Sequence, residues 1–326
     1  MGRFVSLVVA ALLGLSAGAT ATPIPLDPDP LERGIALAGP AVYRLDVTVD
    51  IAALDHAGGR LQLSPEAGRV TTTGTAFGIA AGGWLAAADH VVGGRGEAAA
   101  ISAYQQHLRE EGRPASREAA RSWVAIQDAE PAGVRIVSRS IAQSDEGTAW
   151  EPTVAARKPG TDLALLRISR RGAPALDLRD ARTRGTPVSV LSYRGDAGAP
   201  TALVARRGAL GRTGTAPSTR PPGALRTIVE AEIDRGDSGA PVVDADGRVR
   251  GMVVALNRGG GGTIEPAARI RALLGDRATP GEATLSAAWR AGLADLWALD
   301  FPAAGRAMTR IIDLSPDHAG AVSYTH

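Results

Sequence analysis

The stretch Asp234-Arg235-Gly236-Asp237-Ser238-Gly239-Ala240-Pro241 decides how the rest of the sequence is interpreted. Glycines on either side of Asp237-Ser238 permit a tight turn, because glycine adopts backbone angles that are closed to other residues. Such a turn exposes the serine hydroxyl and aims backbone N–H groups at the point where negative charge develops when the hydroxyl attacks. The following run, Val242 to Val249, predicts a strand, a turn and a strand that would fix Ser238 on the rim of a barrel. Taken alone, the motif could also be an ordinary surface turn.

A serine hydroxyl needs a base before it can act as a nucleophile. Of the five histidines, only His90 ends a strand-like run; His107 falls in an expected helical insertion and His318 in the C-terminal tail, where we expect both to be solvated. Asp162 heads the very apolar run Leu163 to Ile168, where a partly buried carboxylate would orient the histidine and stabilise its imidazolium form. Each residue alone has a simpler interpretation, as a structural histidine or a strand cap.

Short strand-like runs separated by Gly, Pro and Asp clusters make up most of the middle of the chain, which favours paired barrels or a sandwich. The predicted strands are Val42–Val49, Thr75–Ile79, Gly83–Ala87, Val134–Val137, Leu163–Ile168, Pro187–Leu191, Leu203–Arg206, Thr227–Val229 and Val249–Leu256.

The chain order His90, Asp162, Ser238 is that of the chymotrypsin arrangement and differs from the order in subtilisins and α/β-hydrolases. With these residues in their strand context, the chain resembles the HtrA/Deg branch of the trypsin-like serine proteases over residues 37–276. The segments that carry the resemblance are Pro40–Arg44, Gly74–Gly78, Asp89–Val92, Thr161–Ile168 and Glu230–Gly239.

The resemblance implies an all-β fold of two six-stranded antiparallel β-barrels with the site between them. It implies that His90 is the general base, Asp162 its orienter and Ser238 the nucleophile, and that the N–H groups of Gly236 and Ser238 form an oxyanion hole. The expected activity is that of a serine endopeptidase that hydrolyses peptide bonds of exported or misfolded proteins through an acyl-enzyme. The alternative is a catalytically latent binding module on a protease fold, acting through its helical tail.

The sequence departs from the family pattern at several positions. Ala240 replaces the usual glycine, and Asp89 stands before His90 where relatives have small or amide residues, so its carboxylate would favour the protonated histidine. No activating N-terminal motif precedes the His90 strand, which leaves Asp237 without a predicted partner. The residues after position 276 are too few for a PDZ domain.

The substrate pocket has two competing interpretations. Glu232 lies six residues before Ser238, where trypsin-like enzymes place the pocket floor, and an acid there would favour basic side chains. Ala255 and Leu256 would supply a wall that favours small or aliphatic side chains. We expect the second preference, which is the commoner one in this branch.

Composition narrows the alternatives. The 326 residues are 44% hydrophobic and 21% charged, which is ordinary for a soluble globular protein. The absence of cysteine excludes thiol catalysis, disulfides and cysteine-ligated metals. The net charge of +2, without basic runs interleaved with aromatics, argues against a nucleic-acid partner. No metal-ligand spacing or phosphate-binding glycine loop is found, so we expect no metal and no cofactor.

The N-terminus has the layout of a secretory signal peptide over residues 1–21, with Arg3, the apolar run Phe4–Leu15 and a small-residue cleavage site. We expect cleavage, a periplasmic or secreted mature protein, and no stable membrane insertion; an uncleaved anchor is the alternative. The proline-rich residues 22–36 are expected to be a linker.

Two regions predict helices. Residues 96–127 read as an insertion, with Ile101, Tyr104 and Leu108 on one helical face. Residues 277–326 form an expected helical tail whose spacing resembles a single tetratricopeptide repeat, with departures at Asp295 and Met308. A generic helical hairpin is the alternative, and the tail is a possible surface for a protein partner.

Overall fold

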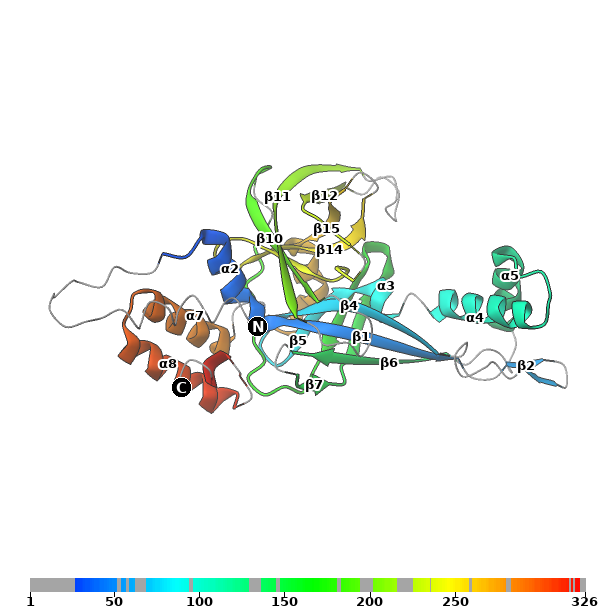
Figure 1. The fold of residues 1–326 in the computed structure, drawn as a ribbon, viewed down its shortest axis with the longest axis horizontal. Helices are drawn as coiled ribbons and strands as arrows, with labels where there is room; N and C mark the ends of the chain where they lie inside the picture. The colour runs from blue at the N-terminus through cyan, green and yellow to red at the C-terminus, as the bar shows by residue number, and fades with distance from the viewer. Residues whose placement is uncertain are drawn as a thin grey trace, which may run out of the picture.

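The strand-rich middle of the chain forms two antiparallel β-structures, one from each half of the peptidase-like region (Figure 1). The protein is represented by a computed structural model, which describes residues 27–51, 54–56, 59–61, 69–93, 96–128, 136–144, 147–180, 183–193, 202–215, 225–234, 236–257, 260–279, 283–316, 318 and 320–322. The signal peptide expected at residues 1–21 lies outside the described residues.

The N-terminal sheet has seven strands in the order β7-β6-β1-β4-β5-β9-β8. Their bounds are β1 Val42–Ile51, β4 Arg69–Ala80, β5 Trp84–Ala88, β6 Ile136–Gln143, β7 Ala149–Trp150, β8 Thr153–Lys158 and β9 Leu163–Arg167. Tyr43, Leu45 and Phe77 fill its core, and all three are completely buried. A separate antiparallel pair consists of β2 (Leu54–His56) and β3 (Gly59–Leu61).

The expected closed six-stranded barrel is therefore an open seven-stranded sheet in the N-terminal half. Its edge strands β7 and β8 are separated in sequence only by Glu151 and Pro152. Proline has no N–H to donate to a ladder, so Pro152 removes one possible hydrogen bond at this corner. The fold class is nevertheless the predicted all-β, trypsin-like one.

The C-terminal barrel is closed, in the order β10-β11-β12-β15-β14-β13. Its strands are β10 Pro187–Tyr193, β11 Leu203–Thr215, β12 Leu225–Glu230, β13 Pro241–Val243, β14 Val249–Leu256 and β15 Gly262–Pro266. Val190, Leu210 and Ile264 are buried in its centre, as the alternation of apolar residues along each strand requires.

The helices are α2 Pro30–Ala38, α3 Asp89–Val92, α4 Gly96–Glu110, α5 Arg117–Asp128, α6 Ala267–Leu274, α7 Thr284–Trp297 and α8 Phe301–Leu314. Three 3₁₀ turns accompany them: η1 Gly39–Ala41, η2 Pro159–Thr161 and η3 Gly275–Arg277. The two helices of the insertion lie where the sequence predicts them, and Figure 1 shows them at one end of the molecule, beyond the N-terminal sheet. Within the described ranges, no helix is long and apolar enough to cross a membrane.

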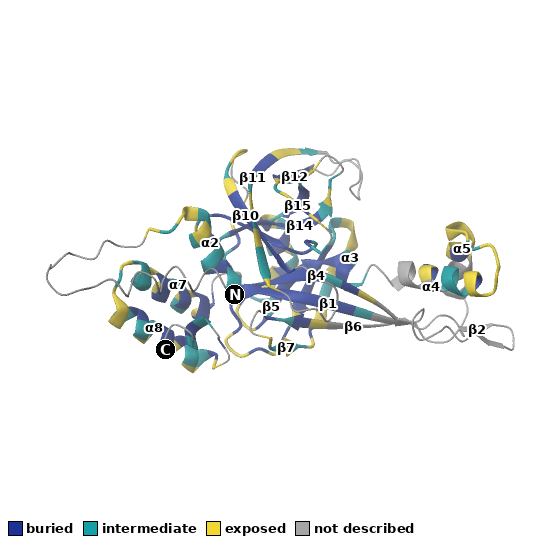
Figure 2. Cartoon of the chain, viewed as in Figure 1, coloured by how far each residue is buried: buried dark blue, intermediate teal, exposed yellow. Residues whose placement is uncertain are grey.

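Helix α2 replaces part of the expected linker. Asp29 caps it by accepting from Leu31 N and Glu32 N, and Pro30 occupies its first turn, where a missing N–H costs nothing. Its Leu37 packs with Trp289 and Met308 of the helical tail, and Trp289 Nε1 donates to Ala36 O at 2.9 Å. Figure 2 shows the buried faces of α7 and α8 turned toward each other.

His318 is also unlike its prediction. Only 1% of it is exposed, and its ring lies 4.9 Å from that of Trp289 between centroids. The expectation of a solvated histidine fails because the residues after α8 fold back onto α7. His107 is likewise largely covered, with 15% of its side chain exposed beside Glu111.

Candidate active site

Strand pairing brings His90 and Asp162 together. β5 and β9 are antiparallel with Ala88 opposite Leu163, so the residues just beyond this pair leave the sheet at the same place. His90 stands in the single turn of α3 that follows β5, and Asp162 stands between η2 and β9. Residues 72 positions apart thus become neighbours.

Asp162 accepts three hydrogen bonds from the turn that contains His90. Its Oδ1 accepts from His90 N at 2.8 Å, its Oδ2 accepts from His90 Nδ1 at 2.6 Å, and its carbonyl accepts from Asp89 N at 3.1 Å. The residue adopts a left-handed conformation with φ of 56°, which aspartate tolerates better than most residues. Because an ionised carboxylate only accepts, the hydrogen of the ring is assigned to Nδ1.

Ser238 lies on the other side of the histidine. With Nδ1 protonated, His90 Nε2 is an acceptor, and Ser238 Oγ donates to it at 3.0 Å. The serine loop is docked on the N-terminal sheet, since Thr75 N donates to Ser238 O at 2.9 Å. Gly239 makes this approach possible: its φ is 89°, and a Cβ there would collide with the Thr75 carbonyl. The row Asp162–His90–Ser238 therefore spans the junction of the two β-structures.

Asp237 has a partner that the sequence did not reveal. It is completely buried, and its carboxylate accepts from Ser192 Oγ at 2.6 Å, from Asp234 N at 2.7 Å and from Arg206 Nη1 at 3.2 Å. Arg206 comes from β11 and Ser192 from β10, so the barrel itself supplies the countercharge. A single arginine in a strand gives no local signal of such a role.

The two N–H groups predicted to form an oxyanion hole belong to Gly236 and Ser238 of the serine loop. Gly236 has a φ of 97°, a conformation that favours glycine. Neither Gly236 N nor Ser238 N donates a hydrogen bond to another residue within the described part of the chain.

The predicted pocket residues differ in how far they are buried. Glu232 is exposed, and its neighbour Ile233 is buried instead, with 8% exposure, against the barrel core. A Cβ on Gly262 would lie 3.0 Å from Ile233 Cγ1, so the two positions are in contact. Leu256 is 52% exposed and Ala255 is half-buried. The acidic pocket floor at Glu232 and the pocket wall at Ala255 and Leu256 both stay predictions.

Asp89 is the buried carboxylate next to His90, and Arg157 of β8 neutralises it. Arg157 Nε donates to Asp89 Oδ1 at 2.6 Å and Nη2 donates to Oδ2 at 3.2 Å. The hydrogen bond to Asp89 raises the pKa of Arg157, against the opposing effect of burial. The sequence analysis expected the Asp89 carboxylate to favour protonated His90 and named no partner for it, because Arg157 lies 68 positions away.

A second buried charge cluster is centred on Glu265. Glu265 of β15 is completely buried, pairs with Arg226, and accepts from Arg269 Nη1 at 2.8 Å. Burial raises the pKa of Glu265, the two arginines oppose this, and the negative charge of Asp162 adds a smaller increase. This cluster could not be predicted from local sequence, since its members lie on β12, β15 and α6.

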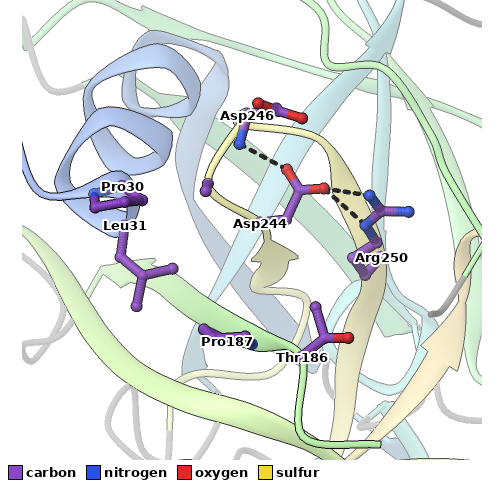
Figure 3. Close-up of a pocket in the computed structure, with 8 residues that line it drawn as sticks. Pro30, Leu31, Thr186, Pro187, Asp244, Asp246 and Arg250 are labelled. Carbon is purple, nitrogen blue, oxygen red and sulfur yellow. Dashed lines mark hydrogen bonds and ion pairs between the residues drawn. The ribbon is translucent and has the colours of Figure 1, made fainter. Parts of the chain in front are cut away.

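A cavity of about 220 Å³ lies away from these residues, between α2 and the barrel (Figure 3). Its walls include Pro30, Leu31 and Pro187, together with the ion pair of Asp244 and Arg250. Asp244 also accepts from two backbone N–H groups of its own turn, which makes the pair a structural clamp. Within the described ranges, no group of three or more histidine, aspartate or glutamate side chains could hold a metal.

Comparison with known proteins places this geometry in context. The family model of the trypsin-like peptidase domain matches residues 74–252. A variant of the HtrA-type protease AlgW with a decapeptide is 19% identical over 73% of this chain and 64% of that chain, with a TM-score of 0.50. This likeness extends to the fold alone. No curated protein matches the sequence significantly.

Two further solved structures are similar to a lesser degree. A variant of AlgW with a tripeptide is 17% identical over 74% of this chain and 60% of that chain, with a TM-score of 0.48. The inactive form of a variant of Rv3671c from M. tuberculosis H37Rv is 17% identical over 78% and 96% of the two chains, with a TM-score of 0.47. The chain thus spans less than two thirds of the length of these HtrA-type structures.

Proposed function

Because the chain belongs to the family of trypsin-like peptidases, we propose that it is a serine endopeptidase that hydrolyses peptide bonds through an acyl-enzyme on Ser238. The observation that carries the proposal is the unbroken row of hydrogen bonds from Ser238 Oγ to His90 Nε2, at 3.0 Å, and from His90 Nδ1 to Asp162 Oδ2, at 2.6 Å. These are the distances at which a base can take a proton from a hydroxyl.

In the first half of the reaction, Ser238 Oγ attacks the carbonyl carbon of the scissile bond while His90 Nε2 takes the hydroxyl proton. Asp162 stabilises the imidazolium that forms and keeps the ring oriented. The N–H groups of Gly236 and Ser238 stabilise the oxyanion, an interaction that typically contributes about 10²–10³-fold per donor to kcat. The imidazolium then gives its proton to the leaving amine, and the acyl-enzyme remains.

In the second half, His90 takes a proton from water, whose oxygen attacks the acyl carbon. The oxyanion forms again in the same hole, and its collapse breaks the ester to Ser238. The proton returns to Ser238 Oγ from His90. No metal or cofactor enters any step.

The contact between Asp237 and Arg206 supports a serine loop that is ready without an activating cleavage. In this arrangement Arg206, a cation within the folded chain, donates from Nη1 to Asp237 Oδ2 at 3.2 Å. Asp237 is the residue directly before Ser238. The loop would then keep its N–H groups aimed before substrate arrives, which is the condition for electrostatic preorganisation.

We further propose that the substrates are exported or misfolded polypeptides and that the mature protein is periplasmic or secreted. The signal-peptide layout of residues 1–21 is the basis for this location. A preference for small or aliphatic side chains follows from the buried Ile233 and the exposed Glu232. The helical tail remains a candidate surface for a protein partner.

The test is casein cleavage together with fluorophosphonate labelling of the mature protein. Ser238→Ala should abolish both, and Ser102→Ala should leave both unchanged, since Ser102 is an exposed serine on α4. Residual cleavage by Ser238→Ala would assign the nucleophile elsewhere. If the unaltered protein neither cleaves nor labels, the latent binding module becomes the better description.

A further inference from the structure

The residue immediately before His90 is a carboxylate that the proposed reaction does not use. Only 5% of the side chain of Asp89 is exposed. An unpaired carboxylate at such a position costs several kcal/mol of desolvation and would compete with Asp162 for the imidazolium. Its environment therefore has to neutralise it.

Arg157 neutralises Asp89 by a two-point contact. Nε and Nη2 of one guanidinium reach the two oxygens of one carboxylate, at 2.6 and 3.2 Å. Such a fork fixes orientation as well as charge, because a planar guanidinium matches the plane of a carboxylate. The guanidinium also lies against Gly93, the residue after α3, where any Cβ would collide with it. The backbone is thus shaped to receive this side chain.

The contact joins the two segments that deliver the proposed catalytic residues. Asp89 is the first residue of α3, directly before His90. Arg157 is near the end of β8, from which the chain passes through η2 to Asp162. A backbone hydrogen bond from Asp89 N to Asp162 O, at 3.1 Å, makes a second connection between these segments. The Asp89–Arg157 contact and this hydrogen bond therefore both join α3 to the segment that runs from β8 to Asp162.

We propose that Asp89 and Arg157 form a positioning pair that holds the turn of His90 against the turn of Asp162 and leaves Asp162 as the sole carboxylate acting on the imidazole. This inference rests on the proposed serine-protease function. Neither residue is a catalytic residue, because both act through His90 and Asp162.

The geometry explains why a second clamp is useful. Asp162 adopts a left-handed backbone conformation, which stores strain that its surroundings must balance. Among the strands that the structure describes, β8 is an edge strand that pairs with β9, and their ladder has a bulge between Val154 and Ala156. The fork fastens the end of this irregular strand to α3. A misplacement of about 1 Å between base and nucleophile can lower turnover by about a hundredfold.

The charged and titratable groups around His90 make the role of the pair measurable. Asp162 contacts the ring directly, Asp89 and Arg157 lie behind its backbone, and Ser238 faces Nε2. Glu265 pairs with Arg226 and Arg269, and the negative charge of Asp162 adds a small increase to the pKa of Glu265. Removing Arg157 alone leaves an extra negative charge near His90, whereas removing Asp89 alone leaves an extra positive one.

The decisive experiment is an NMR titration of ¹³C-labelled His90 in a Ser238→Ala background, with Arg157→Gln, Asp89→Asn and the double variant. Arg157→Gln should move the midpoint of the His90 titration to higher pH by about half a unit or more, and Asp89→Asn should move it to lower pH. The double variant should return to within a few tenths of a unit. Lys158→Gln, the adjacent exposed cation on β8, is the matched control and should move nothing comparable.

Kinetics separate positioning from charge. With Ser238 present, all three variants should lose about tenfold or more in kcat with little change in KM, because the fork is absent in each. A purely structural role would lower the melting temperature without opposite movements of the midpoint, and that result would overturn the proposal. Midpoints that do not move, or that move in one direction, would do the same. If the unaltered protein proves inactive, the proposed function fails, while the titration still decides the role of the pair.

Discussion

At the scale of the residue, the interaction of Arg206 with Asp237 determines whether the serine loop keeps its shape. Asp237 is fully buried, and its carboxylate forms an ion pair with Arg206. Removing Arg206 takes its positive charge away from a buried carboxylate that also accepts from Ser192 Oγ and Asp234 N. Breaking a buried ion pair in this way costs about 3–5 kcal/mol.

Arg206→Met should therefore lower the free energy of unfolding by several kcal/mol and reduce the rate of fluorophosphonate labelling. Both are measurable on one preparation, by denaturant unfolding and by labelling kinetics. Arg207→Met is the matched control, because Arg207 is 51% exposed and its surface pair with Glu32 contributes less than about 1 kcal/mol. Equal effects of the two substitutions would contradict the role assigned to Arg206.

Gly239 provides a second prediction at this scale. Gly239→Ala should abolish labelling and destabilise the protein, since a methyl group there meets the Thr75 carbonyl and the φ of 89° disfavours alanine. Gly160→Ala should change neither property appreciably, because no atom lies within 4 Å of its added methyl and its backbone is not left-handed. Labelling and thermal melting of the two variants check this difference.

The residues that the sequence identified and those it missed differ in how they are recognised. Ser238, His90 and Asp162 each lie at the end of a strand-like run, and their order along the chain supports all three together. Arg157, Arg206 and Glu265 have no comparable signature. Each is a single charge within or beside a strand, and its partner depends on strand register, which local sequence does not determine.

At the scale of the element, β15 carries a buried acid with an unusual titration. Burial raises the pKa of Glu265 above the 4.5 of an ordinary glutamate. A raised pKa in the folded state means that protonated Glu265 favours folding. Its contribution is complete below the unfolded pKa and is lost as pH rises through the folded pKa.

The difference in melting temperature between the unaltered protein and Glu265→Gln should accordingly fall as pH rises from about 4.5 toward neutrality. Comparing the two proteins cancels the titration of other carboxylates. Scanning calorimetry at a series of pH values checks this. A difference that grows with pH would mean that Arg226 and Arg269 outweigh the effect of burial.

Helices were predicted from periodicity with mixed success. The insertion and the tail have apolar faces repeated at helical spacing, and α4, α5, α7 and α8 lie where these faces indicate. Helix α2 was missed because the prolines of residues 22–36 suggested a linker. Asp29 before Pro30 is nevertheless a start signal for a helix, with a capping carboxylate followed by proline in the first turn.

At the scale of the whole molecule, α2 and the helical tail share one apolar cluster, and Arg170 ties the tail to the N-terminal sheet. Arg170 is 6% exposed, donates to Tyr43 Oη at 3.3 Å and to Ser315 Oγ at 3.4 Å, and lies over the ring of Trp150. The tail is therefore packed as part of the folded body. Sequence could not indicate this, because each of these contacts joins distant parts of the chain.

Trp289→Ala should lower the free energy of unfolding by about 3–5 kcal/mol, since Trp289 is 6% exposed and joins α2 to α7. Unfolding should remain a single transition by circular dichroism. Phe301→Ala is the control on the neighbouring helix, where 52% exposure predicts a loss of less than about 1 kcal/mol. Two separate transitions in the unaltered protein would show that the tail unfolds independently of the body.

The bond from Trp289 to Ala36 has a consequence for the order of events during synthesis. Its partners are 253 positions apart, and the same cluster includes Ala321. A chain that emerges N-terminus first presents α2 before the helices that cover it. The β-structures can pair beforehand, whereas the apolar face of α2 stays uncovered until α7 and α8 have also emerged. Closure of this cluster therefore follows the synthesis of both β-structures.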